Sequence, residues 1–418
     1  MLWARRALET FRRTSLLRAR TPPELLPKGL PIAEEALPYY NPKHYYPVRV
    51  GEVLNDSFLV TNKLDYGLIS TIWLARDLRR WSWENNRYVV LKMFSNNEDF
   101  KHIFEHETMY HKHIMDVAPS HPGLFSIRKA YDSFTVQGPA GPHVCLVCEP
   151  MVESFSVYQQ RSDDKKASIP AIKLTVWLML SALDYLHRKC RLIYTDITLT
   201  NILMSVNDPT VIDQAAREEY TDRPAPRKVL DDRIIYSPRS TLSDHTSYIG
   251  FPKLADFSDV MPGAAGIPLN YTIQFPPYRS PEVVLGAEWS YSTDVWNLGV
   301  LIWDMLEGRH LFEGLDPYRL EYGKPVHLAQ MIALLGPPPA ELLARGAKSS
   351  DYFNPDGSFK YPELIPRGRS FENSVTQFED EADKELFFGF VRKMLRWLPE
   401  NRATCRELLE HPWLGIKP

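Results

Sequence analysis

The pattern of apolar and polar positions after residue 45 predicts a small sheet followed by a helix. Short runs rich in β-branched and aromatic residues occupy Phe58–Thr61, Leu64–Arg76 and Arg87–Met93. This composition is typical of β-strands. A stretch with helical character then runs from Glu98 to Met115. We therefore expect strands first and then one main helix in this part of the chain.

A second informative pattern lies between Leu192 and Met204, where two apolar stretches flank a polar turn. It predicts two short strands joined by a rigid loop, from which Asp196 and Asn201 project. A positioned carboxylate can accept a proton, and an amide oxygen can help to hold a metal ion. Taken alone, such a pattern is more often a solvated turn.

Lys92 stands near the end of the third apolar run, where an unpaired ammonium group would be costly to bury. Glu107 lies 15 positions further on, in the middle of the expected helix. This separation leaves room for a strand end, a turn and two helical turns, so the two side chains can meet. A structural salt bridge explains such a pair as well as an anion-binding site does.

The beginning of the chain has a different composition from the rest. Residues 1–20 contain six arginines and one acidic residue, together with several apolar positions. This fits a mitochondrial transit peptide and a disordered basic tail equally well. Seven prolines between Pro22 and Pro47 favour an extended linker. We therefore assign residues 1–44 to a basic, proline-rich extension that is disordered or serves in targeting, and expect the folded part to begin near Tyr45.

Composition and charge narrow the class of protein. A length of 418 residues with 44% hydrophobic content indicates a globular protein of two or three packed units. The formal net charge of -3 gives no reason to expect direct binding to nucleic acid. No apolar run of about 18 residues is free of charge, so no membrane span is expected.

The cysteines indicate a reducing environment. The four of them, at positions 145, 148, 190 and 405, are too few and too scattered for a disulfide framework. Cys145 and Cys148 have a metal-like spacing, but they lie in an apolar run and no second pair of ligands is near. We therefore expect buried core cysteines and an intracellular protein.

Several short motifs follow one another along the chain in the order found in eukaryotic protein kinases. They are Gly67-x-x-Ser70-Thr-Ile72, Val89-Val-Leu-Lys92, Glu107, Asp196-x-x-x-x-Asn201, Asp256-Phe-Ser258, Tyr278-Arg-Ser-Pro-Glu282, Asp294-Val-Trp296 and Arg402. With them, the stretch from Tyr45 to Leu414 resembles this family. The resemblance implies an α+β, two-lobed kinase fold. Its small antiparallel-sheet lobe would span residues 45–150 and its larger, mostly helical lobe residues 151–418.

The individual residues within and around these motifs are similar to those of the SR-protein kinases, and most similar to those of the fungal members. They include Tyr46-Pro-Val-Arg-Val-Gly-Glu52, Leu183-Asp-Tyr-Leu-His-Arg-Lys-Cys190 and Ile332-Ala-Leu-Leu-Gly336. The interval of 55 positions between Asn201 and Asp256 also resembles the SR-protein kinases, because these kinases carry an insertion between the two corresponding motifs. We expect this insert, at about residues 208–250, to be a surface loop because it has few periodic apolar residues.

The resemblance implies a role for each candidate residue. Contacts to the nucleotide would come from Leu64, Gly67, Ile72, Val90, Lys92, Glu149 and Met151. Lys92 would hold the phosphates of ATP and would be positioned by Glu107, while Asp196 would act as the catalytic base. Asn201 and Asp256 would hold Mg²⁺. The implied reaction is transfer of the γ-phosphate of ATP to Ser or Thr side chains of a protein.

Departures from the family pattern leave a second function class open. Asp65 replaces a glycine and brings a negative charge close to the expected phosphates. Thr198 replaces the loop lysine, and Ser258 replaces the glycine of the Asp-Phe-Gly motif. The retained residues favour an active Ser/Thr kinase, whereas these substitutions favour a pseudokinase or weakly active scaffold. A small-molecule kinase is a third class, which the motifs of the large lobe disfavour.

The expected partner is a protein substrate. SR-protein kinases resemble one another in an acid-rich stretch suited to arginine-serine repeats, but the corresponding stretch here is Tyr322–His327. The nearby Glu313, Asp316 and Glu321 could attract arginine, so an Arg/Ser-rich or otherwise basic substrate is expected. We expect a monomer in the cytoplasm or nucleus, with mitochondria as the alternative if the basic tail is a transit peptide.

Overall fold

The computed structural model describes residues 21–81, 84, 86–243, 245–263, 269–316 and 319–415, which form two compact units. The first, called the sheet unit below, comprises the chain up to Met115 together with Arg128–Ser154 and Leu203–Phe251. The second, the helical unit, comprises Asp116–Ile127, Phe155–Ile202 and the chain from Pro252 onwards. An antiparallel sheet in one unit and a mostly helical second unit confirm the predicted α+β class.

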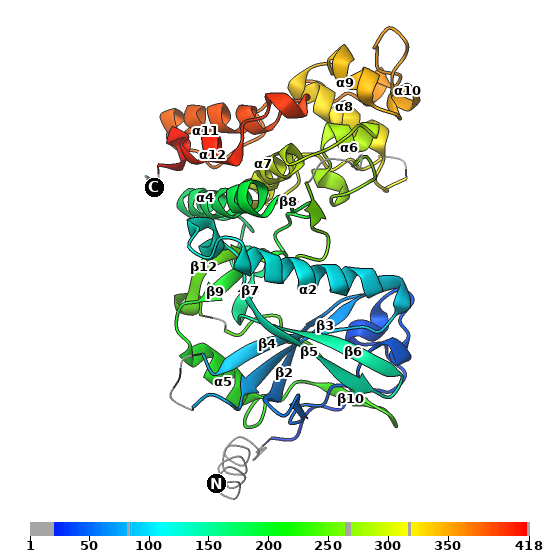
Figure 1. Cartoon of the computed structure of the whole chain (residues 1–418). Coiled ribbons are helices and arrows are strands. Elements are labelled where there is room, and N and C mark those ends of the chain that lie inside the picture. Colours follow the sequence, from blue (N-terminus) through cyan, green and yellow to red (C-terminus); the bar gives the residue numbers. More distant parts are fainter. Residues whose placement is uncertain are drawn as a thin grey trace, which may run out of the picture. The chain divides into compact units, whose positions relative to one another are not determined.

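The sheet unit is built on a six-stranded antiparallel sheet with the strand order β1-β2-β3-β4-β6-β5 (Figure 1). Its strands are β1 (Val53–Leu54), β2 (Phe58–Tyr66), β3 (Ser70–Asp77), β4 (Tyr88–Phe94), β5 (Ala130–Gly138) and β6 (Gly141–Cys148). The predicted main helix is α2 (Lys101–Asp116). The predicted runs Phe58–Thr61 and Leu64–Arg76 are divided differently in the structure: β2 continues to Tyr66, and the turn to β3 lies at residues 67–69.

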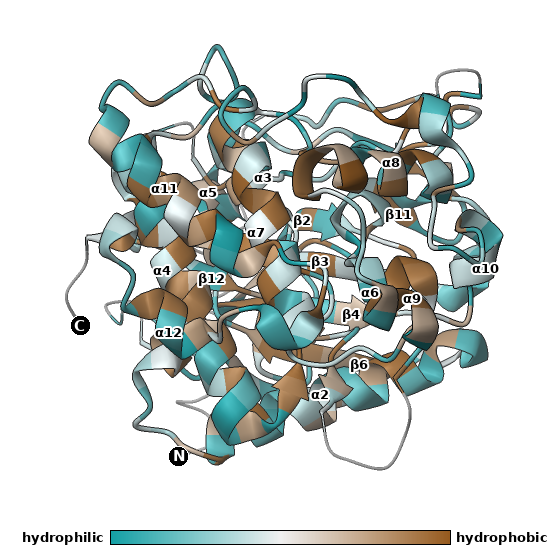
Figure 2. Cartoon of the chain, turned by 90° about the horizontal axis from the view of Figure 1, so that it is seen from above, coloured by the Kyte–Doolittle hydropathy of each residue, from teal (hydrophilic) through white to brown (hydrophobic). Residues whose placement is uncertain are grey.

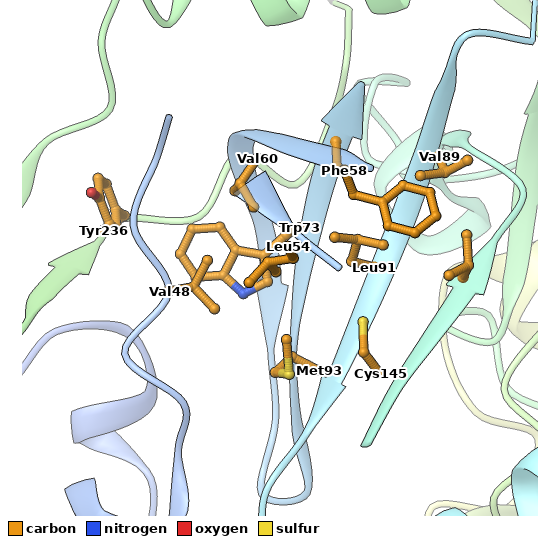
Figure 3. Packing of buried hydrophobic residues seen from close by; sticks show 12 residues of the cluster. Val48, Leu54, Phe58, Val60, Trp73, Val89, Leu91, Met93, Cys145 and Tyr236 are labelled. Carbon is orange, nitrogen blue, oxygen red and sulfur yellow. The ribbon is translucent and has the colours of Figure 1, made fainter. Parts of the chain in front are cut away.

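Both faces of this sheet are covered by packed apolar side chains, because successive residues of a strand point to opposite faces. One face carries a cluster to which Val48, Phe58, Trp73, Leu91 and Tyr236 belong (Figure 3). The other face carries a cluster to which Leu74, Val90, Phe94, Leu146 and Phe104 of α2 contribute. Each fully buried side chain of this size stabilises the fold by about 1.5–3 kcal/mol, so burial on both faces is the main support of the sheet.

The insert at residues 208–250 is folded, in contrast to the surface loop that we predicted. It contains α5 (Thr210–Glu218), β10 (Arg227–Val229) and β11 (Ile234–Tyr236). One face of α5 buries Val211, Ile212, Ala215 and Ala216 in the same cluster as Val90. The prediction failed because the helix has only about two turns, so its apolar face is too short to stand out as a periodic pattern.

Residues 21–44 also pack within the sheet unit and do not form the extended linker that the prolines suggested. Leu25 pairs with Arg227 of the insert in a parallel bridge, and short 3₁₀ helices cover Ala33–Ala36 and Pro42–His44. Glu34 is 7% exposed and forms an ion pair with Lys63. The predicted transit peptide falls on residues 1–20, outside the described residues.

Two small sheets frame the polar loops that carry candidate residues. One has the strand order β12-β9-β7, with β7 at Met151–Ser154, β9 at Ile202–Val206 and β12 at Ile249–Leu254. The other pairs β8 (Leu192–Ile193) with β13 (Met261–Pro262). Loop 194–201 therefore joins β8 to β9, as predicted, and loop 255–260 joins β12 to β13.

The helical unit is organised around α4 (Ile169–Tyr185), which contacts α7 (Ser292–Glu307) and α12 (Cys405–Leu409). The other helices are α3 (Phe155–Gln159), α6 (Pro281–Leu285), α8 (Lys324–Leu335), α9 (Ala340–Arg345), α10 (Ser349–Tyr352) and α11 (Glu381–Met394). Figure 2 shows hydrophilic and hydrophobic positions alternating along α11. By length and composition Ile169–Cys190 could cross a membrane, but 67% of its apolar 18-residue window is buried in the fold, as in a core helix.

Candidate active site

Lys92 of β4 and Glu107 of α2 form a buried ion pair in the sheet unit. The Nζ of Lys92 lies 2.9 and 2.8 Å from the two carboxylate oxygens of Glu107. The two side chains are 7% and 2% exposed. The alternation along β4 places Lys92 on the same face as Val90 and Phe94, which is the face that α2 contacts. The carboxylate therefore holds the ammonium group in a fixed place beside the apolar cluster.

Three residues predicted to contact the nucleotide lie in that same cluster. Val90 is a buried member of it, and the partly buried Leu64 and Ile72 pack against it. Ile72 of β3 is also the direct cross-strand partner of Lys92. The structure thus brings a flat apolar wall and a fixed cation together, which is the combination that a purine base and its phosphates require.

Gly67 opens the turn between β2 and β3, and the backbone holds this turn at two points. The amide of Gly67 donates a hydrogen bond to the carbonyl of Ser70 at 2.8 Å. The hydroxyl of Tyr45 lies 2.9 Å from the carbonyl oxygen of Leu68 and 3.3 Å from that of Gly67. A Cβ added at Gly67 would meet no atom closer than 4.0 Å, so the fold by itself does not require glycine at this position.

Glu149 and Pro150 form the short connection between β6 and β7, and Met151 is the first residue of β7. The amide of Glu149 donates to the carbonyl of Lys129 at 2.9 Å, and its own carbonyl accepts from the Nε of Arg128 at 3.0 Å. A carbonyl oxygen has two lone pairs, so this one can accept a further hydrogen bond. Pro150 has no amide hydrogen, which leaves the backbone of Glu149 and Met151 as the polar groups of this connection.

In the helical unit, the loop 194–201 is anchored by Asp294 of α7. The buried carboxylate of Asp294 accepts hydrogen bonds from the amides of Tyr194 at 2.7 Å and Thr195 at 2.8 Å, and it lies 2.8 Å from the Nε2 of His187. Thr195 has a φ of 71°, which is unfavourable for a β-branched residue. These contacts hold the strained backbone in place and so fix the direction in which the next residue, Asp196, projects.

Asp196 and Asn201 are in direct contact across this loop. The Nδ2 of Asn201 donates to the Oδ2 of Asp196 at 2.8 Å and to its carbonyl oxygen at 3.1 Å. The amide oxygen of Asn201 is therefore directed away from these contacts. Burial, with the negative charges of Asp259 and Asp256, raises the pKa of Asp196 to about 6, while the hydrogen bond from Asn201 opposes this shift.

Asp256 lies in the loop that follows β12, and the chain links this loop to residues 194–201. The amide of Ala255 donates to the carbonyl of Asn201 at 2.9 Å, and the hydroxyl of Tyr194 donates to the carbonyl of Ala255. Asp256 has a φ of 56°, a left-handed conformation that aspartate tolerates better than most residues. Its Oδ1 accepts from the amide of Ser258 at 3.3 Å. Asp196, Asn201 and Asp256 thus belong to one connected group.

The three positions that depart from the family pattern are accommodated without strain. Ser258 has no positive φ, so its backbone does not need glycine. The hydroxyl of Thr198 lies 2.8 Å from that of Thr200, and neither residue supplies a cation. Asp65 is exposed, and its carboxylate accepts from the amide of Tyr66 at 2.8 Å. The substitutions thus change the charge available near the loops and leave their backbone intact.

Glu282 and Arg402, which belong to two of the kinase-like motifs, form an ion pair in the helical unit. The two guanidinium nitrogens lie 2.7 and 2.6 Å from the two carboxylate oxygens, and both side chains are fully buried. Such a two-point contact between planar groups is among the strongest of polar interactions. It ties α6, at the end of the segment 256–282, to the C-terminal part of the unit.

Sequence reasoning missed two contributors to these sites. Asp259 places a second negative charge near Asp196, and its carbonyl accepts from the hydroxyl of Thr195 at 2.7 Å. The only signal for it was a further acid three positions after Asp256. Tyr45 reaches the turn at Gly67 from 22 positions away, and no local pattern marks it. Asp294 belongs to one of the motifs, but its role as the acceptor for the amides of loop 194–201 was not predicted.

Comparison with known proteins leads to the same family that the sequence motifs resemble. The protein kinase domain family matches residues 78–414. A serine/threonine protein kinase of Aspergillus fumigatus is 35% identical over 394 residues, which cover 93% of this chain and 92% of that protein. The serine/threonine-protein kinase SRPK of Physarum polycephalum is 30% identical over 408 residues, covering 92% of each chain, and SRSF protein kinase 3 of Sus scrofa is 23% identical with 89% of this chain covered. The chain therefore belongs to the protein kinase family, as a serine/threonine protein kinase of the SRPK-like group.

Proposed function

We propose that Asp196 is the base that receives the proton of the acceptor hydroxyl when this kinase transfers the γ-phosphate of ATP to a Ser or Thr side chain. The observation that carries the proposal is its hydrogen bond from Asn201 together with a pKa near 6. A general base works best when its pKa lies near the working pH, because it is then ionised and still able to take up a proton. The anchored loop 194–201 supports a fixed orientation for this carboxylate.

Lys92 is the residue we assign to the phosphates of ATP, the nucleotide that the kinase family implies. Its pairing with Glu107 supports this role, because a fixed ammonium group can neutralise phosphate charge without reorganising. Leu64, Ile72 and Val90 are assigned to the apolar contact with the base of the nucleotide. The turn at Gly67 and the connection from Glu149 to Met151 offer backbone groups for its phosphates and its base.

We assign Asn201 and Asp256 to the metal ion, which we take to be Mg²⁺. One amide oxygen and one carboxylate fit this ion, which usually binds one or two protein oxygens and otherwise phosphate oxygens and water. Across the described ranges, no group of three or more His, Cys, Asp or Glu side chains is placed to hold a metal ion on its own. When bound with ATP, the ion would neutralise charge on the transferred phosphate.

A weakly active or inactive scaffold is the second candidate. It is favoured by Thr198 and Thr200, which leave the loop without the lysine common in the family, and by the exposed carboxylate of Asp65. A lost charge-assisted contact weakens stabilisation of the transition state by roughly 1.5–3 kcal/mol, or one to two orders of magnitude in rate. This is a reduction and not a complete loss, so we place the active enzyme first.

For the substrate, we propose a protein rich in arginine and serine or otherwise basic near the acceptor site. The proposal is supported by the similarity of the chain to the SRPK of Physarum polycephalum and to SRSF protein kinase 3 of Sus scrofa. We further propose that the protein acts inside the cell as a monomer. All four cysteines are buried and none of them forms a disulfide bond, in keeping with a reducing compartment.

The test is Mg²⁺-dependent transfer of labelled γ-phosphate from ATP to an arginine-serine peptide and to a general basic protein. The Asp196→Ala variant is the control, and thermal unfolding with and without ATP is measured in parallel. We expect transfer by the wild-type chain and a loss of about 10²–10⁴-fold in the variant. Labelling of neither acceptor, with ATP still raising the unfolding temperature, would instead establish the scaffold.

A further inference from the structure

The helical unit contains a cavity of about 450 Å³ that none of the proposed steps uses. We call it the arginine cavity, after the residues that line it. Its charged and polar lining includes Arg309, His310, Glu313, Arg367, Arg369 and Asn373. The charged lining comes from two segments of the chain, one directly after α7 and the other between α10 and α11, and Trp303 of α7 and Gln330 of α8 complete the lining.

The lining of the arginine cavity carries an excess of positive charge. It holds three arginines and one carboxylate, whereas the whole chain has a net charge of -3. Within the part of the chain that the structure describes, none of the three arginines lies within 4.0 Å of a carboxylate oxygen. Guanidinium groups at this density normally have anionic partners, so the cavity favours a negatively charged occupant.

The position of Arg369 strengthens this conclusion. Its guanidinium group donates to the carbonyl of Leu311 and lies 5.8 Å above the centre of the Phe312 ring, so its direction is set by the fold. Burial, and then the positive charge of Arg309, lowers the pKa of Arg369, and the single carboxylate of the cavity, Glu313, only partly opposes this shift. The two like charges therefore oppose each other across the cavity lining, and an anion placed between them would relieve that repulsion.

The arginine cavity continues into a second cavity of about 600 Å³ that leads towards the proposed catalytic loop. The two cavities share Arg309, His310 and Glu313. The second is lined further by Leu199 of loop 194–201 and by residues 275–277 of the segment 256–282. A polypeptide with its acceptor near Asp196 could therefore extend along the second cavity and reach the arginines.

We propose that the arginine cavity docks an acidic segment of the protein substrate, a run of Asp and Glu side chains outside the site of phosphorylation. The proposal rests on the proposed function for the identity of the partner as a substrate. Carboxylate side chains match the paired donors of arginine, and the volume admits more than one of them. It also means that a substrate carries acidic residues for docking in addition to any basic residues around its acceptor.

Direct binding tests the proposal independently of phosphate transfer. A fluorescent peptide with a run of Asp and Glu is titrated with the full-length Asp196→Ala chain, in the absence of ATP, at low and high salt. The same chain is prepared with Arg309→Glu or with Arg367→Glu, both at exposed positions, and with Arg406→Glu as the matched control on α12. A basic peptide and a phosphoserine peptide of equal length are measured beside the acidic one.

We expect the acidic peptide to bind, to lose at least about tenfold in affinity with Arg309→Glu or Arg367→Glu, and to be unaffected by Arg406→Glu. Binding should also weaken as salt rises. Absence of binding, equal binding by all variants, or binding of the phosphoserine peptide alone would overturn the proposal. Because no transfer is measured, an inactive enzyme would not produce any of these results.

Discussion

Two buried lysine–glutamate pairs lie on opposite faces of the same sheet, and they differ in what surrounds them. Lys92 of β4 pairs with Glu107 of α2, next to the apolar wall that includes Ile72. Lys63 of β2 pairs with Glu34, which comes from the segment 21–44. The second pair lies on the face shown in Figure 3, where the ring of Trp73 is 5.7 Å from the Nζ of Lys63.

The groups that surround Lys63 stabilise its positive charge within the fold. Burial lowers the pKa of Lys63, and the carboxylate of Glu34 opposes that shift. The ammonium group also lies 5.6 Å from the centre of the Tyr66 ring, so two aromatic faces contribute to its environment. The comparison shows that burial and pairing of a lysine do not by themselves mark a phosphate site. The groups around the pair separate a structural role from a chemical one.

Replacing each lysine by methionine tests this distinction most directly. We expect Lys92→Met to lower kcat/KM for phosphate transfer by about 10²–10³-fold, because a fixed charge facing the phosphates is removed. Lys63→Met should leave kcat/KM of the folded protein within about threefold and lower its unfolding temperature. Transfer assays and thermal unfolding of both variants provide the comparison. Equal losses of activity in the two variants would remove the distinction between the faces.

The next largest expected effect is the contribution of the Lys63–Glu34 pair to the free energy of unfolding. Glu34→Gln leaves a buried ammonium group with a neutral partner, so we expect the free energy of unfolding to fall by about 2–3 kcal/mol. Denaturant unfolding measures this change. Glu98→Gln is a suitable control, since its exposed carboxylate pairs with a lysine, Lys101, that is itself exposed. A change below about 0.5 kcal/mol for Glu34→Gln would show that segment 21–44 adds little to the fold.

The pKa of Asp196 extends the comparison to a half-buried carboxylate for which no ion pair is found within the described ranges of the chain. With a pKa of about 6, the carboxylate is protonated in acid, so kcat/KM should fall about tenfold for each pH unit below 6. Asp259→Asn removes one of the charges that raise this pKa and should move the midpoint to lower pH. A pH profile with an unchanged midpoint in Asp259→Asn would argue against this electrostatic origin.

The same shift has a consequence for stability with a definite sign. The folded carboxyl of Asp196 binds its proton more tightly than the unfolded one, so stability falls as pH rises from about 4 to about 6. Asp196→Asn should remove this penalty and raise the free energy of unfolding at pH 7 by on the order of 2–3 kcal/mol. Unfolding curves at pH 4 and pH 7 test the claim, and an equal effect at both values would contradict it.

The smallest expected effect concerns Tyr45, which follows the segment that carries Glu34. Its hydroxyl contacts the carbonyl oxygens of Gly67 and Leu68, so Tyr45→Phe should loosen the turn assigned to the phosphates. We expect a rise of about two- to fivefold in KM for ATP with little change in kcat, since a neutral hydrogen bond is worth about 1 kcal/mol. Tyr39→Phe, at a fully exposed position, is the control. A lower kcat with unchanged KM would assign Tyr45 another role.

The sequence was most informative where contacts are close along the chain or belong to an ordered set of motifs. The spacing of Lys92 and Glu107, together with the change from strand to helix between them, was enough to predict that they meet. The polar turn between two apolar stretches likewise predicted the loop of Asp196 and Asn201. The insert at 208–250 was misjudged because its helix has only a short apolar face. The segment 21–44 was misjudged because its prolines favoured an extended linker, whereas its packing depends on distant residues such as Lys63 and Arg227.

By itself the sequence determined the α+β class, the order of the motifs and the residues that could carry the chemistry. Only the tertiary structure decided that Asp294 accepts the amides of Tyr194 and Thr195. The same holds for the pairing of Glu34 with Lys63 and for the shared cavity of Arg309 and Arg369. The physical reason is that these contacts join residues tens of positions apart, so they depend on how the elements pack and leave no local pattern.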